Sequence, residues 1–152
     1  AWLMLRSLET LKLRMDKQQE NAIEVANYLR HHPKIEKVYY LDKHVKEKNF
    51  DIWINQCSGS GAMISFDVVG GEKEAFMFLN NLKLIKLAVS LGSTESLAQH
   101  PSTMTHIGVD EEIKQTLGIS EKLIRLSIGV ENNVDLIKDI EQALSKAYSE
   151  QT

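Results

Sequence analysis

The sequence predicts an α+β fold: one domain with a mostly antiparallel sheet and helices packed on one face of it. Helical and strand patterns alternate along the 152 residues, and the strand patterns are apolar on one side only. One-sided strands are typical of antiparallel sheets whose second face is left open. The length suits a single hydrophobic core, and 43% hydrophobic and 26% charged residues are typical of globular domains. We therefore expect residues 1–152 to form one domain.

The first element is predicted to be a long or bent helix that runs to about Pro33. Apolar residues recur at spacings of three and four from Met4 to Leu29. No Ser, Asp or Asn cap precedes the first apolar residue, so the chain is expected to begin inside a helix, as a fragment of a larger protein often does. His31 and His32 are expected to cap the last carbonyls of this helix.

A strand, a helix, a second strand and a second helix are predicted next. "KIEKVYYL" is rich in β-branched and aromatic residues, which favours a strand, and the polar "DKHVKEKNFDIWINQ" favours a helix. "AMISFDVVGG" alternates, with Ile64, Phe66 and Val68 on one face, and predicts a strand. "EKEAFMFLNNL" predicts the helix that follows it.

The second half of the chain continues this alternation. "KLIKLAVSL" and "KLIRLSIGV" predict strands, and "DEEIKQTLG" between them predicts a short helix that ends at Gly118. "NNVDLIKDIEQALSKAY" predicts a final helix, with Asn132 or Asn133 as its cap and an apolar stripe that includes Ile140 and Leu144.

The open face of the predicted sheet carries a candidate anion site. In "KLIRLSIGV" the alternation turns Ile124 and Leu126 toward the helices and Arg125 away from them. In "LAVSL" it separates Leu87, Val89 and Leu91 from Ser90, so that Ser90 and Arg125 would share the open face. The alternative is that Arg125 is a solvated or ion-paired strand residue.

Charge and cysteine content narrow the function classes. A formal net charge of −3 favours neither nucleic acid nor an anionic membrane as a partner. The apolar runs are too short for a signal or membrane-spanning segment. The lone Cys57 cannot form an internal disulfide, which fits a reducing compartment such as the cytosol, and we expect a buried, inert thiol there.

Other motifs carry little chemistry. His100 and His106 lie six positions apart, without the short spacing of a metal pair, so no metal is expected. There is no glycine-rich phosphate loop and no GxSxG nucleophile elbow. Four acidic residues are expected to be surface carboxylates: Asp67, Asp110, Glu111 and Glu112.

Three segments match one known family in order and spacing. They are "LAVSLGSTESLAQHPSTMTH", "LGISEKLIRLSIGVEN" and "DLIKDIEQAL". With them, the chain resembles the carboxy-terminal domain of the Cys/Met-metabolism enzymes that use pyridoxal phosphate (PLP), the group of methionine gamma-lyase and cystathionine gamma-lyase. The resemblance covers essentially all 152 residues. It implies the small C-terminal domain of a fold type I enzyme, beginning within the long inter-domain helix.

The resemblance implies roles for four residues. In the family the serine of "SLG" and the arginine of "RLS" hold the substrate α-carboxylate, and these positions are Ser90 and Arg125 here. The chemistry fits, because a guanidinium fork binds a carboxylate bidentately and a nearby hydroxyl satisfies remaining lone pairs. Thr105 stands where the family places a further polar residue near this site. His100 is expected to be structural.

The resemblance also implies what this chain lacks. The family's N-terminal domain carries the Schiff-base lysine, the residue stacked on the ring and the phosphate-binding groups, and nothing in these residues matches those motifs. PLP is thus the expected cofactor of the parent enzyme, with no cofactor-binding or catalytic residue in this chain, which is expected to be inactive alone. Family members are commonly tetramers, so a homotetrameric parent is expected.

The residue before Ser90 points to a substrate. Cystathionine-handling relatives tend to carry an acidic residue there, able to meet the distal ammonium group, whereas this chain has Val89. An apolar neighbour suits the thioether of methionine, so we expect elimination of a thiol from methionine with release of a 2-oxo acid and ammonia. The alternatives are cystathionine gamma-lyase or gamma-synthase, and a non-catalytic ligand-binding or dimerising module. O-acetylhomoserine sulfhydrylases fit less well.

Overall fold

A five-stranded sheet of order β1-β2-β5-β4-β3 is the centre of the computed structural model, which describes residues 1–42 and 50–149. The strands are β1 (Ile35–Tyr39), β2 (Met63–Val68), β3 (Lys86–Leu87), β4 (Leu97–Gln99) and β5 (Leu123–Ser127). The pairs β1–β2, β2–β5 and β4–β5 are antiparallel, and β3–β4 is parallel. The predicted mostly antiparallel sheet is confirmed.

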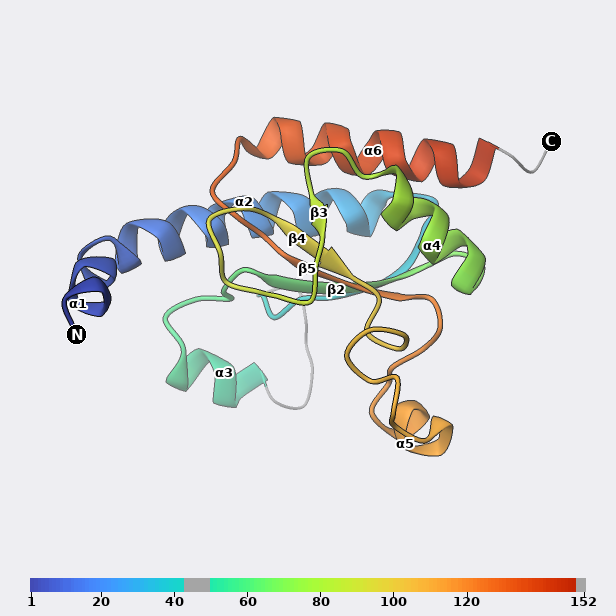
Figure 1. The fold of residues 1–152 in the computed structure, drawn as a ribbon, viewed down its shortest axis with the longest axis horizontal. Coiled ribbons are helices and arrows are strands. Elements are labelled where there is room, and N and C mark those ends of the chain that lie inside the picture. The colour runs from blue at the N-terminus through green and yellow to red at the C-terminus, as the bar shows by residue number, and fades with distance from the viewer. Residues whose placement is uncertain (43–49, 150–152) are drawn as a thin grey trace.

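Helices form two groups around this sheet. The helices are α1 (Trp2–Glu9), α2 (Leu11–His31), α3 (Phe50–Gln56), α4 (Glu72–Asn81), α5 (Glu111–Thr116) and α6 (Asn133–Ser149). In Figure 1, α2, α4 and α6 run along the upper side of the strands, while α3 and α5 lie below them. The predicted α+β fold with its main helical layer on one face is confirmed. Among the described residues, no helix is both long and apolar enough to span a membrane.

The core fills the space between the sheet and the layer of α2, α4 and α6. The register places Ile64 opposite Leu126 and Phe66 opposite Ile124, and all four side chains are fully buried. Phe66 also meets Phe78 of α4 edge to face, with ring centroids 5.7 Å apart. Full burial of each such side chain stabilises the fold by roughly 1.5–3 kcal/mol.

Helix α6 is fixed at its start and along its buried side. The side-chain Oδ1 of Asn132 accepts a hydrogen bond from the main-chain N–H of Val134 at 2.9 Å, so Asn132 is the cap. Ile140 and Leu144 of the predicted stripe are fully buried. Asp139 is also buried, and its carboxylate accepts from three successive main-chain N–H groups, those of residues 83–85, at 2.9 to 3.2 Å. Asp139 thereby ties α6 to the turn before β3.

The amino-terminal helix is bent, as predicted. Thr10 separates α1 from α2, and α1 buries none of its residues, whereas α2 packs on the core. At the other end of α2 a ring nitrogen of His31 lies 2.8 Å from the carbonyl oxygen of Asn27, which confirms its capping role. The ring of His32 does not cap a helix carbonyl, so this prediction was wrong: His32 Nδ1 accepts a hydrogen bond from the main-chain N–H of Lys34. The main-chain N–H of His32 caps the helix instead.

The region 83–99 departs from the prediction. The strand expected over 83–91 is reduced to Lys86–Leu87, and the short strand β4 was missed. Leu87, Val89 and Leu91 are 51 to 55% exposed, so they do not face the core. The cause is the position of β3 at the sheet edge, where β4 is its one partner among the described strands.

Three further expectations need correction or restriction. Cys57 is exposed rather than buried, because it follows directly on α3 in a surface turn. Asp67 is buried rather than superficial, and its carboxylate accepts from Tyr39 Oη at 2.7 Å and Ser120 Oγ at 2.8 Å. Of the helix expected over 42–56, α3 forms the described part Phe50–Gln56, and the prediction for residues 43–49 lies outside the described residues.

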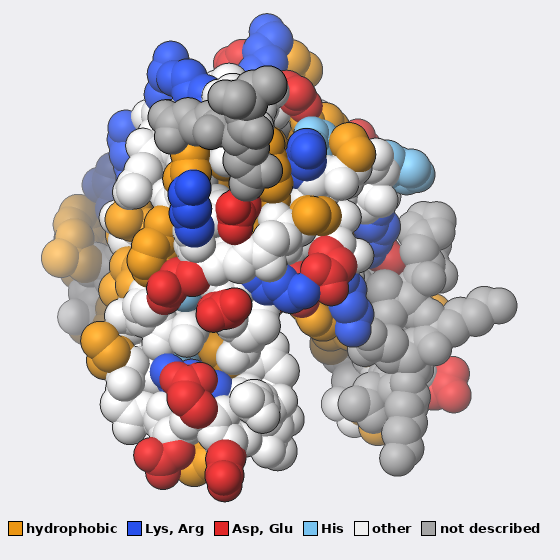
Figure 2. Space-filling model, turned by 90° about the vertical axis from the view of Figure 1, so that its right-hand side faces the viewer, with side chains coloured by type: hydrophobic (Ala, Val, Ile, Leu, Met, Phe, Trp, Pro, Cys, Tyr) orange, Lys and Arg blue, Asp and Glu red, His pale blue; other side chains and the backbone are white. Residues whose placement is uncertain are grey.

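The carboxylates at α5 are exposed, as predicted. Acidic side chains gather at the lower end of the face shown in Figure 2, the end that carries α5 in Figure 1. Asp110, Glu111 and Glu112 are exposed there, and Glu111 pairs with Lys114 at 2.7 Å. These carboxylates form a solvated helix face.

Candidate functional site

A row of polar side chains crosses the open face of the sheet. The register aligns Ser65 of β2, Arg125 of β5 and Gln99 of β4. Since the neighbours of Arg125 on β5, Ile124 and Leu126, belong to the core, the alternation of a strand turns Arg125 to the opposite face. The predicted position of Arg125 is confirmed.

The guanidinium of Arg125 is held from one side. Its Nη2 donates to Gln99 Oε1 at 2.8 Å and, more weakly, to the carbonyl oxygen of Val89 at 3.5 Å. Partial burial lowers the pKa of Arg125, but an arginine side chain stays protonated in folded proteins. None of the ion pairs between described residues involves Arg125, so these residues leave its charge uncompensated.

Gln99 connects Arg125 to Thr105. Gln99 is 1% exposed, and its amide nitrogen donates to Thr105 Oγ1 at 3.3 Å. Thr105 therefore joins the site through Gln99, which agrees with its expected place near Arg125. Sequence reasoning missed Gln99, because only the pairing of β4 with β5 shows that it lies opposite Arg125.

Ser90 lies in an exposed loop beside this row. We call residues 88–96 the Ser90 loop. The carbonyl contact of Val89 with Arg125 brings the beginning of this loop to β5, and the N–H of Gly92 donates to Ser127 Oγ at 2.8 Å. Ser90 directly follows Val89 in this loop, and it lies outside the strands, so the strand alternation predicted for it is wrong. The side chain of Val89 is 54% exposed.

This arrangement suits a carboxylate ligand. An arginine presents five N–H donors, and the contacts described above engage only Nη2. A carboxylate can therefore take a bidentate position on the guanidinium. The partial burial strengthens such a charge-assisted contact relative to one in water.

The histidines have structural contacts. His100 is 1% exposed, its Nε2 lies 2.6 Å from the carbonyl oxygen of Glu121 and its Nδ1 lies 2.8 Å from Thr103 Oγ1. These contacts make Nε2 the donor and confirm the structural role predicted for His100. His106 Nδ1 lies 2.8 Å from Thr105 Oγ1. The part of the chain that the structure describes contains no His, Cys, Asp and Glu cluster fit for a metal ion.

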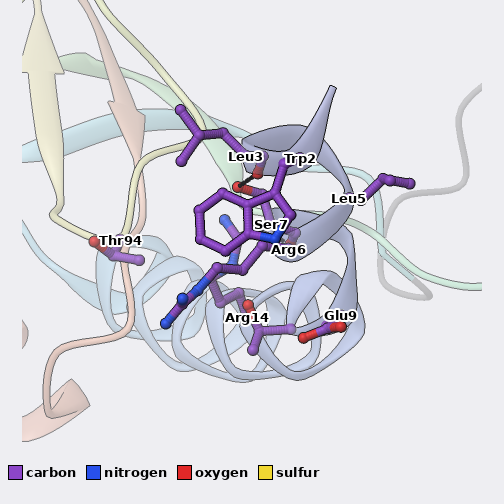
Figure 3. A pocket seen from close by; sticks show the side chains of 9 residues that line it. Trp2, Leu3, Leu5, Arg6, Ser7, Glu9, Arg14 and Thr94 are labelled. Atoms are coloured by element: carbon purple, nitrogen blue, oxygen red, sulfur yellow. Dashed lines mark hydrogen bonds between the residues drawn. The ribbon is translucent and has the colours of Figure 1, made fainter.

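A further cavity lies away from Arg125. It measures about 810 Å³ and is lined by α1, the start of α2 and Thr94 (Figure 3). Its apolar lining is mostly exposed, with Trp2 at 66% and Leu3 at 71%, and Arg14 already donates to the carbonyl oxygen of Ser7 at 2.9 Å. This hollow has neither an enclosed wall nor an uncompensated buried charge, so we place the candidate site at Arg125.

Relatives of known activity match nearly the whole chain. L-Methionine gamma-lyase of Fusobacterium nucleatum subsp. nucleatum is 45% identical over 148 residues, which are 96% of this chain and 37% of that protein. Cystathionine gamma-lyase of Mus musculus is 44% identical over 150 residues, which are 97% of this chain and 37% of that protein. The chain thus spans less than two fifths of the length of these relatives.

Solved structures give the same picture. Cystathionine gamma-lyase from Lactobacillus plantarum in complex with L-serine superposes with a TM-score of 0.87 at 40% identity, over 96% of this chain and 38% of that one. A putative O-acetylhomoserine (thiol)-lyase from Campylobacter jejuni gives 0.88 at 36% identity, over 95% of this chain and 34% of that one. The sequence profile of the Cys/Met metabolism PLP-dependent enzymes matches residues 1–145. The chain therefore belongs to the family of Cys/Met metabolism PLP-dependent enzymes.

Proposed function

We propose that this chain is the substrate-carboxylate domain of a PLP-dependent carbon–sulfur lyase of sulfur amino-acid metabolism. In this proposal Arg125 and Ser90 hold the α-carboxylate of the amino acid, and Thr105 lies beside them. The observation that carries the proposal is the partly buried guanidinium of Arg125, which is oriented by Gln99 and pairs with no described carboxylate.

The division of labour within the enzyme is also a proposal. We infer that residues 1–152 form the C-terminal domain and that the cofactor is held by the remainder of the enzyme. Among the described lysines only Lys114 is buried, and it is paired with Glu111, so these residues do not fit the anchoring of PLP. When bound, PLP supplies the electron sink for cleavage of bonds next to the α-carbon. A homotetrameric and cytoplasmic parent enzyme belongs to the same proposal.

The role of this chain is then to orient the substrate. A carboxylate held by two N–H groups of Arg125 can neither rotate nor shift freely, and this fixes the direction of the α-carbon and side chain relative to the rest of the site. The partial burial of Arg125 limits competition by water for the same donors. The isolated chain is expected to bind the carboxylate weakly and to catalyse nothing.

Methionine is the substrate that Val89 favours. The exposed Val89 side chain is apolar and next to Ser90, so it suits a methyl thioether better than a charged group. Cystathionine is the second candidate, because relatives with that activity are 44% identical to this chain. The fold does not separate the two, since a thiol-lyase of another name superposes equally well.

The carboxylate assignment is tested by Arg125→Ala in the full-length enzyme that contains this chain. The probe is L-norleucine, which has the length of methionine but no thiol to eliminate, compared with L-norleucinamide, which lacks the carboxylate. The dissociation constant of L-norleucine should rise at least tenfold, since a carboxylate left buried and unpaired costs about 2–5 kcal/mol. The amide should bind almost as before.

Two further variants make this test specific. Arg125→Lys should recover only part of the affinity, because lysine keeps the charge but loses the planar fork. Lys122→Ala is the matched control, since Lys122 lies three positions away and pairs with Glu36 instead. An Arg125→Ala enzyme that is folded and still prefers the acid over the amide would refute the assignment.

The substrate choice is tested by Val89→Glu in the same enzyme. A carboxylate beside an apolar thioether must be desolvated without a partner, whereas it can meet the distal ammonium group of cystathionine. The ratio of kcat/KM for cystathionine to that for methionine should therefore rise. Val89→Leu serves as the control of size, and an unchanged ratio in Val89→Glu would remove the argument for methionine.

A further inference from the structure

Main-chain hydrogen bonds hold the Ser90 loop at both ends. At its beginning, the N–H of Ala88 donates to the carbonyl oxygen of Ala98 at 3.0 Å. At its end, Ser96 is fully buried, and its carbonyl oxygen accepts from the N–H of Lys86 at 3.1 Å. The position of Ser90 between these ends depends on what fixes Ser96.

Glu131 is the residue that fixes Ser96. Its carboxylate accepts from the main-chain N–H of Ser96 at 2.6 Å and from Ser96 Oγ at 2.8 Å. Ser96 Oγ in turn accepts from the N–H of Gly129 at 2.8 Å. Hydrogen bonds to an ionised acceptor are about twice as strong as neutral ones, so this contact is the strongest hold on the loop.

Gly129 and Thr94 bring the loop into direct contact with the end of β5. A β-carbon at Gly129 would lie 2.3 Å from the carbonyl oxygen of Thr94, so the loop passes over a position where only glycine fits. The same carbonyl oxygen accepts from the N–H of Val130 at 2.8 Å.

Helix α2 supports Glu131 from the other side. Asn21 is fully buried, and its amide nitrogen donates to the carbonyl oxygens of Gly129 and Glu131 at 3.0 and 2.7 Å. Gln18, one turn earlier and 1% exposed, donates to the carbonyl oxygen of Ser93 at 2.6 Å. The loop and the Glu131 backbone are thus bound to one helix.

We propose that Glu131 is a positioning residue for the carboxylate site: through Ser96 it sets the place of the Ser90 loop relative to Arg125. The inference rests on the proposed function. Glu131 makes no contact with the ligand in this scheme. It determines whether Ser90 and the Val89 carbonyl stand where Arg125 and a bound carboxylate can both reach them.

The test uses the full-length enzyme and the same pair of ligands, L-norleucine and its amide. Glu131→Ala should raise the dissociation constant of the acid at least about fivefold, because small misplacements of binding groups are costly, and should lower the preference for the acid over the amide. Glu131→Gln keeps the shape and one acceptor, so it should lie between Glu131→Ala and wild type. Glu95→Gln, at an exposed carboxylate of the same loop, should change nothing.

A substitution at Gly129 should also alter the position of the loop. A β-carbon at Gly129 would lie 2.3 Å from the Thr94 carbonyl oxygen and 2.4 Å from Glu131 Oε2, so Gly129→Ala should displace both the loop and the Glu131 carboxylate and reproduce the loss of acid preference. When Glu131→Ala is combined with Ser96→Ala, the loss of affinity for the acid should be smaller than the sum of the two single losses, because both changes remove the contact between Ser96 Oγ and Glu131. A general loss of folded protein would lower the number of binding sites without altering the acid-to-amide ratio.

The possible results separate this inference from the proposed function. If Arg125→Ala abolishes the acid preference and folded Glu131→Ala and Glu131→Gln keep it, Glu131 has no positioning role. If Arg125→Ala also keeps the preference, the carboxylate assignment itself fails. A loss of the preference in Arg125→Ala, Glu131→Ala and Gly129→Ala, graded by Glu131→Gln, supports both.

Discussion

The two faces of the sheet differ in what their side chains do. On the face toward α2, α4 and α6, Phe66 and Ile124 are fully buried and apolar. On the opposite face, one position along the same strand β5, Arg125 is partly buried, charged and bonded to Gln99. Adjacent residues of one strand therefore serve stability and binding separately. Substitutions one position apart should have unlike consequences.

The largest effect on stability is expected from Phe66→Ala. Removing a fully buried ring that also meets Phe78 leaves a cavity and should lower the free energy of unfolding by about 3–5 kcal/mol. Urea unfolding of the chain, followed by circular dichroism, measures it. Arg125→Ala, on the other face, should change the same quantity by less than about 1 kcal/mol. Equal losses in the two variants would show that the faces are not divided in this way.

The next largest effect is expected from Asp139→Ala. Three main-chain N–H groups before β3 would lose their acceptor in a buried place, at a cost of roughly 2–3 kcal/mol. Asp139→Asn retains one acceptor oxygen and should cost less. Asp135, exposed in the first turn of α6, provides the control, and its replacement by Ala should cost under about 1 kcal/mol. If Asp139→Ala lowered the free energy of unfolding no more than Asp135→Ala does, solvent would have replaced the lost acceptor.

A smaller effect is expected from the cap of α6. Asn132→Ala should lower the free energy of unfolding by about 1 kcal/mol, because the N–H of Val134 loses its acceptor. Asn132→Asp should retain the cap. Asn133→Ala, one position later, tests the assignment of Asn132 as the cap. A greater loss of unfolding free energy in Asn133→Ala than in Asn132→Ala would make Asn133 the cap instead.

The smallest effect is a dependence on pH at the end of α2. Burial lowers the pKa of His32, against the attraction of Glu141. Since the folded pKa lies below the unfolded value near 6.5, the unfolded state takes up the proton first as the pH falls. The free energy of unfolding should thus decline slightly between pH 7 and pH 5.5, and His32→Gln should flatten this part of the curve. A steeper decline in His32→Gln would reverse the sign assigned here.

Sequence patterns within a single segment predicted which side of a strand or helix is buried and where a helix begins. The alternation of "AMISFDVV" is sufficient to turn Ile64 and Phe66 to the core, and an Asn before an apolar stripe is sufficient to begin α6. The same rule correctly turned Arg125 to the open face. These features depend on neighbours two to four positions away in the chain.

The features that were missed depend on distant partners. Leu87, Val89 and Leu91 alternate like a buried strand, but the sheet order leaves β3 at an edge, and these side chains are exposed. Gln99 becomes part of the site only through the register of β4 with β5. Glu131 likewise acquires its contact with Ser96 across 35 positions of the chain. The periodicity of apolar residues within one segment does not reveal such contacts between distant segments.

The two edges of the sheet determine how the chain can aggregate. Among the described strands, β1 pairs only with β2; it carries the charged Glu36 and Lys37 and has an irregular register between Ile35 and Lys37. β3 at the other edge is two residues long. Charged, irregular and short edge strands offer poor templates for a further strand, so growth into fibrils by sheet extension is disfavoured at both ends. Aggregation at high protein concentration is expected to begin instead at the exposed leucines of α1. A detergent, or a Leu→Lys substitution in α1, should prevent this aggregation.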